Sequence, residues 1–128
     1  MSYYFNKIIN AGFDEAVELT TAALAKEGFG VLTDIDVQAT MKKKLNVDFR
    51  KYRILGACSP AHAFKALTME DKIGTMLPCS VIVQELEPGK IEVAAIDPIA
   101  SMISVKNEGL GDVAIEVQGK LKKVIESL

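Results

Sequence analysis

The chain has 128 residues, of which 25% are charged and 49% apolar, and its formal net charge is −2. We expect a single domain over residues 1–128, because this length and composition are typical of one globular unit. With 15 basic against 17 acidic residues, the chain predicts no nucleic-acid partner, since phosphate binding needs a concentrated basic face.

We predict a cytoplasmic protein with no membrane partner. Met1–Asn10 has no apolar run behind basic residues, as a secretory signal would have. No apolar run approaches the roughly 20 residues that span a bilayer.

The first third of the chain predicts a strand, a helix and a second strand. Tyr3–Ile9 has a weak strand pattern, whereas Phe13–Glu27 places apolar residues at helical spacing and is followed by Gly28 as a stop. Phe29–Ile35 alternates as a strand does. Its residues expected to share one face are Phe29, Val31, Thr33 and Ile35.

The middle of the chain repeats the helix and strand patterns. Asp36 suits the N-cap of a short helix lined by Val37, Met41 and Leu45. Tyr52–Cys58 is apolar on both faces after Arg53, which predicts a central, covered strand.

Two cap-and-proline pairs mark the starts of two later helices. Ser59-Pro60 predicts a helix to about Thr68, with Phe64 and Leu67 as its core contacts. Asp97-Pro98 predicts a short helix to about Val105.

The remaining elements complete a two-layer domain. Ile73–Pro78 is expected to be a connector, and Cys79–Leu86 and Ile91–Asp97 to form a hairpin. Gly109 and Gly111 predict a flexible break before a last helix, Asp112–Leu128, which has one apolar face. The order predicts an α+β fold with helices packed on one face of a mixed or antiparallel sheet of about five strands.

Four segments in matching order resemble one family, the domain of unknown function 302. They are Gly28–Asp36 (GFGVLTDID), Val47–Pro60 (VDFRKYRILGACSP), Leu77–Val83 (LPCSVIV) and Asp97-Pro98. The resemblance implies a compact two-layer α/β domain and a homodimer, and it implies no activity. Ser59 departs from the asparagine expected before the proline, which weakens any role needing a side-chain amide there.

Cys58 and His62 are the first candidate site residues. Cys58 ends a strand directly before a helix N-terminus, where backbone N–H groups favour a thiolate or bind a small anion. The alternative is a small buried cysteine. His62, the only histidine, could pair a thiol with a base or ligate a soft metal. The alternative is a histidine that points to solvent.

The second candidate group depends on the register of the hairpin. If Pro88-Gly89 is a two-residue loop, Ser80 pairs with Asp97 and Cys79 lies beside Asp97; a bulge would shift this register by one. Cys58 and Cys79 share one sheet end only if their strands are antiparallel. The alternative for Asp97 is a plain N-cap.

These observations leave three functional hypotheses and identify no catalytic residue, cofactor or metal motif. The first is a small-molecule or anion binding module acting as a homodimer, with Cys58, Ser59, His62, Cys79, Ser80 and Asp97 as candidate binding residues. The second is a thiol-dependent enzyme or redox sensor using Cys58 and Cys79. The third is a dimeric interaction protein, for which Ile115, off the apolar stripe of the last helix, is the clearest hint.

Overall fold

The computed structural model describes residues 2–128, and Met1 lies outside the described part. Its five strands are β1 (Tyr4–Asn10), β2 (Gly30–Asp36), β3 (Tyr52–Cys58), β4 (Cys79–Glu87) and β5 (Lys90–Ile96). They form one sheet in the order β1-β5-β4-β3-β2, and every neighbouring pair is antiparallel. The α+β fold expected from the sequence is confirmed, with the antiparallel alternative the correct one.

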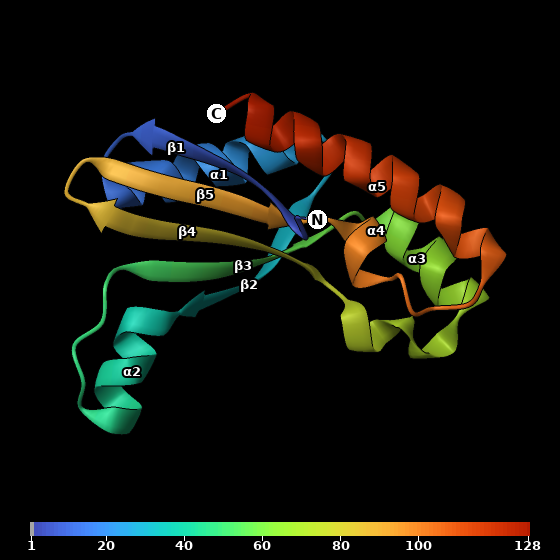
Figure 1. Cartoon of the computed structure of the whole chain (residues 1–128), viewed down its shortest axis with the longest axis horizontal. Coiled ribbons are helices and arrows are strands. Elements are labelled where there is room, and N and C mark those ends of the chain that lie inside the picture. Colours follow the sequence, from blue (N-terminus) through green and yellow to red (C-terminus); the bar gives the residue numbers. More distant parts are fainter. Residues whose placement is uncertain (1) are drawn as a thin grey trace.

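All helices but α2 gather on one side and at one end of this sheet (Figure 1). The helices are α1 (Phe13–Lys26), α2 (Val37–Leu45), α3 (Pro60–Met69), the 3-10 helix η1 (Asp71–Met76), α4 (Pro98–Ser101) and α5 (Glu108–Glu126). Helices α1 and α5 lie along the sheet, α3 and α4 sit together at one end, and α2 projects from the other. None of the helices within residues 2–128 is long and apolar enough to cross a membrane.

One face of the sheet builds the core, and we call it the inner face. Leu55, Val81 and Val93 point to it from three neighbouring strands and are almost completely buried. They pack against the apolar stripes of α1 and α5, represented by Leu24 and Leu121. Burial of these side chains, at roughly 1.5–3 kcal/mol each, holds the two layers together.

The opposite face, which we call the open face, carries no such helical layer. Ile35 pairs with Ile54, Ile54 with Ile82, and Ile82 with Ala94, so an apolar row crosses four strands. Ile35 at its end is 48% exposed.

The predicted alternation of the second strand is wrong, because a β-bulge interrupts it. Val31 pairs with Ala57 and Thr33 with Gly56, so Leu32 is the extra residue between them. A bulge shifts side chains to the other face, and Val31 packs against the core while Ile35 joins the open face.

Three predictions for the later helices are also corrected. Phe64 and Leu67 are exposed, and α3 buries the short Ala66 instead, which lets the helix approach its neighbours closely. Gly109 and Gly111 lie inside α5, because Asn107 accepts a hydrogen bond from the Gly109 N–H and caps the helix. Helix α4 ends at Ser101.

Candidate functional site

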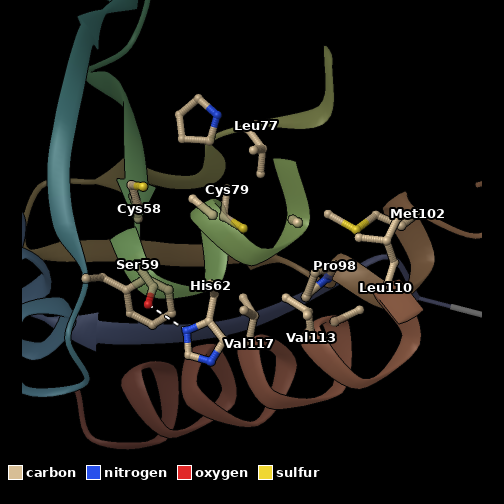
Figure 2. Close-up of a pocket in the computed structure, with 16 residues that line it drawn as sticks. Cys58, Ser59, His62, Leu77, Cys79, Pro98, Met102, Leu110, Val113 and Val117 are labelled. Carbon is tan, nitrogen blue, oxygen red and sulfur yellow. Dashed lines mark hydrogen bonds between the residues drawn. The ribbon is translucent and has the colours of Figure 1, made fainter. Parts of the chain in front are cut away.

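A small pocket lies where β3 and β4 meet the helical end of the molecule (Figure 2). Its volume is about 40 Å³, which is space for roughly three water molecules or a group of similar size. Most of the lining is apolar and comes from α3, the loop before β4, α4 and α5; it includes Ala63, Leu77, Pro98, Met102, Val113 and Val117. The polar lining consists of Cys58, Ser59, His62 and Cys79.

The two cysteines come to the same end of the sheet because β3 and β4 are antiparallel. Ala57 pairs with Cys79, which makes Cys58 and Cys79 close neighbours across the two strands. Both are free thiols. Burial, and secondarily the nearby Cys58, raises the pKa of the Cys79 thiol to about 11. Cys79 is therefore a protonated, weakly nucleophilic thiol at neutral pH.

Ser59 and His62 form one end of a hydrogen-bonded chain. Ser59 Oγ lies 2.7 Å from His62 Nδ1, and His62 Nε2 lies 2.7 Å from Glu116 Oε2 on α5. The side chain of His62 is only 14% exposed, whereas that of Glu116 is 59% exposed. The hydrogen bond from His62 holds the pKa of the Glu116 carboxyl below its usual value.

The start of α3 is unusual because Ser59 does not cap it with its side chain. Pro60 has no N–H, and the N–H groups of Ala61 and His62 have no acceptor within the helix, since they belong to its first turn. The hydroxyl of Ser59 faces the imidazole instead (Figure 2).

Two of the candidate residues lie outside this pocket. The carboxylate of Asp97 accepts from the Ile99 N–H at 3.0 Å and from Gln118 Nε2 at 3.1 and 3.2 Å, so it caps α4 and ties it to α5. Ser80 lies on the open face, where it lines a separate groove. The bulge between Glu85 and Glu87 shifts the predicted hairpin register by one residue.

A four-ligand metal site from the two cysteines, His62 and Asp97 is not formed. Across residues 2–128, no three side chains of the His, Cys, Asp or Glu type come together in a way that could hold a metal ion. His62 uses both ring nitrogens for Ser59 and Glu116.

Sequence reasoning missed Glu116 and the apolar wall that α5 gives to the pocket. Val113 and Val117 belong to the apolar stripe of α5, which predicts core packing but not a cavity beside it. Glu116 is 54 positions from His62, and no local spacing relates them. Only the packing of α5 across the start of α3 brings them together.

Comparison with known proteins identifies the family. The model of the family described as "Domain of unknown function DUF302" matches residues 5–128. The chain belongs to the DUF302 family. Among solved structures, the chain is similar to an uncharacterized conserved DUF302 protein from Bacillus stearothermophilus, with a TM-score of 0.89 and 24% sequence identity over 98% of each chain. No curated protein matches the chain. The family resemblance and the fold inferred from the sequence are thus confirmed. The comparisons carry no information about an activity.

Proposed function

We propose that this DUF302 domain is a small-molecule binding module whose site is the pocket around Cys58-Ser59. The single observation that supports this most strongly is an apolar pocket with a few polar groups at one side, the usual composition of a ligand site. Its volume of about 40 Å³ suits a short neutral group of roughly three heavy atoms.

A neutral ligand fits the lining better than an anion does. Ala63, Met102 and Val113 surround the space, and a charge moved among such side chains loses its hydration. Within the pocket lining no lysine or arginine is present to compensate that loss. The N-terminus of α3 offers only partial positive charge.

The test is a titration of the uniformly ¹⁵N-labelled protein followed by its amide resonances. Acetone, a neutral group of matching size, should shift the amides of Ala63, Cys79 and Val113 saturably, whereas inorganic phosphate should leave them unchanged. Ala63→Leu fills the pocket and should abolish the acetone shifts. Ala22→Leu, at an exposed position on α1, is the matched control and should retain them. Shifts with phosphate alone, or none with acetone, would contradict the proposal.

The proposed module is a homodimer, in which a second copy of the chain covers α2 and the open face. Helix α2 has nine residues and no buried side chain, although helices shorter than about 12–15 residues are marginal without packing. The exposed apolar residues around it include Leu32, Ile35, Leu45 and Val47.

Charge distribution favours a second copy of the chain as the partner. Residues 37–51, α2 and the loop after it, have five basic residues and one acidic residue, a net +4. The rest of the chain has 10 basic and 16 acidic residues, a net −6. A basic projection on one copy is therefore complementary to the acidic body of the other.

Sedimentation measures this assembly directly. The protein should be a dimer at micromolar concentration, and Ile35→Lys, which places a charge on the open face, should be a monomer. Ile115→Lys, equally polar but on α5 where Ile115 is 57% exposed, should remain a dimer. A monomeric unmodified protein, or a dimer lost only in Ile115→Lys, would contradict this interface.

We also propose that the protein is located in the cytoplasm. Its support is that Cys58 and Cys79 are both free although they lie on neighbouring strands, as expected where thiols are kept reduced. Cell fractionation that recovers the protein outside the cytoplasm would contradict it.

A further inference from the structure

The chain Ser59–His62–Glu116 has the connectivity of a nucleophile, a base and a positioning carboxylate. A carboxylate only accepts hydrogen bonds, so the Nε2 proton of His62 is the donor to Glu116 Oε2 over 2.7 Å. In the neutral imidazole, Nδ1 is then the acceptor, and Ser59 Oγ–H is the donor to it over 2.7 Å. One tautomer thus satisfies both contacts and directs the Ser59 proton toward a base.

The surroundings of Ser59 supply two further requirements of acyl transfer. Because its hydroxyl does not cap α3, the N–H groups of Ala61 and His62 are left at the end of the helix that stabilises negative charge. Such donors stabilise the oxyanion of a tetrahedral intermediate. The adjoining apolar pocket has about 40 Å³, which matches an acetyl or propionyl group in size.

We propose that Ser59 is an acyl-accepting nucleophile for short-chain esters, with His62 as its general base and Glu116 as the positioning residue. The inference rests on the proposed function, because the same pocket holds the acyl group. Ser59 Oγ forms a bond to the ester carbonyl carbon while its proton moves to His62 Nδ1. The carbon–oxygen bond to the alcohol then breaks, and the leaving oxygen takes that proton. Water then forms a bond to the acyl carbon while one of its protons moves to His62 Nδ1. The bond from that carbon to Ser59 Oγ breaks, Ser59 Oγ takes the proton, and the carboxylic acid leaves.

The test uses p-nitrophenyl acetate and the full-length protein. We expect release of p-nitrophenolate and an acetyl group mapped to Ser59 by peptide mass spectrometry. Ser59→Ala should lose the acetylated peptide completely, and His62→Gln should slow acylation by about 100-fold or more. Amide spectra of each variant establish that it is folded. An acetyl group found on Cys58, or equal rates in Ser59→Ala, would overturn the proposal.

The role of Glu116 needs a measurement that a merely structural role would not change. Glu116→Gln should alter the pH dependence of the acylation rate, whereas Glu126→Gln, an exposed position on the same helix, should not. An acylation rate with an unchanged pH profile in Glu116→Gln would contradict the positioning role of Glu116.

Acetone binding separates failure of this inference from failure of the proposed function. If acetone shifts the pocket amides but p-nitrophenyl acetate leaves Ser59 unmodified, the nucleophile assignment is wrong and the binding pocket stands. If neither ligand reaches the pocket, both are wrong.

Discussion

Ser59 and Asp97 both precede a proline that begins a helix, yet their side chains have different roles. Asp97 accepts the Ile99 N–H at 3.0 Å and caps α4. Ser59 instead lies 2.7 Å from the ring of His62 and leaves the start of α3 without a side-chain cap. Both places join a capping type of residue to a proline. The partner that each side chain finds, His62 for Ser59 and the Ile99 N–H with Gln118 for Asp97, distinguishes a candidate reactive group from a cap.

Removing the carboxylate of Asp97 should destabilise the domain. Asp97→Ala loses an N-cap, which costs about 1 kcal/mol, and the contacts of Gln118 at 3.1 and 3.2 Å. Asp97→Asn keeps an acceptor for the Ile99 N–H and is the control. Urea unfolding should rank the alanine variant clearly below the asparagine variant. Equal free energies of unfolding in the alanine variant and the unmodified protein would contradict a capping role.

The reactivity of Cys79 should follow its raised pKa. Burial, then the neighbouring Cys58, places that pKa at about 11, whereas a free cysteine has one of about 8.5. In Cys58→Ala, iodoacetamide should therefore alkylate Cys79 at neutral pH about 100-fold more slowly than a free cysteine. That variant also loses the smaller contribution of Cys58, so its rate tests burial as the main cause. Alkylation as fast as that of free cysteine would restore the thiol-dependent hypothesis for this residue.

The raised pKa of Cys79 also makes the free energy of unfolding depend on pH. Folding favours the protonated Cys79 thiol. The contribution of this thiol to the free energy of unfolding is therefore fully present below the pKa that Cys79 has in the unfolded chain. It is lost as the pH rises toward the folded value of about 11. We expect the free energy of unfolding to fall over this alkaline range less in Cys79→Ala than in the unmodified protein. An identical alkaline loss in both would contradict the assignment.

At the scale of elements, periodicity predicted where most helices and strands lie but not how their ends and faces are arranged. The apolar stripe of α5, from Leu110 to Val124, was visible in the sequence and is buried. The start of α5 was predicted too late because Asn107 caps it and two glycines are accommodated within the helix. The face of α3 was predicted wrongly because Ala66 packs more closely than the larger Phe64 could.

Substitution of the glycines within α5 tests whether they lie inside the helix. A methyl group at Gly111 or Gly119 meets no atom within 4 Å. Alanine there should therefore stabilise the domain by about 0.5–1 kcal/mol, because glycine costs backbone entropy in a helix. At Gly109 the methyl group would lie 3.0 Å from Met69 Sδ, so the gain should be smaller. Thermal unfolding of the three variants should show this order, and a loss of stability in Gly119→Ala would contradict the helix.

At the scale of the whole molecule, the layer arrangement followed from the order of elements, whereas the candidate site did not. Cys58, Ser59 and His62 could be placed together because strand ends and helix starts can be located in a sequence. Cys79 joins them because β3 and β4 are antiparallel, a direction that the sequence left open. Ser80 and Asp97 lie outside the pocket. Ser80 follows Cys79 along β4 and so points to the opposite face, and the Asp97 carboxylate caps α4. Glu116 joins the site through the long-range packing of α5 on α3, which no local pattern encodes.

The proposed homodimer predicts that stability depends on protein concentration. If the second copy covers α2 and the open face, association stabilises the folded state by mass action. The Tm should rise with concentration in the unmodified protein and should be constant in Ile35→Lys. High salt should reduce the rise, because the proposed dimer brings the net-positive segment 37–51 of one copy against the net-negative remainder of the other. A Tm independent of concentration in the unmodified protein would contradict the dimer.

The proposed function requires an accessible, apolar pocket between the start of α3 and α5. Xenon tests it without knowledge of the natural ligand, because xenon enters dry apolar cavities. In crystals under xenon pressure, we predict an anomalous peak between Ala63 and Val113, absent in Ala63→Leu and present in Ala22→Leu. No xenon at this position, or xenon retained there in Ala63→Leu, would contradict the binding pocket.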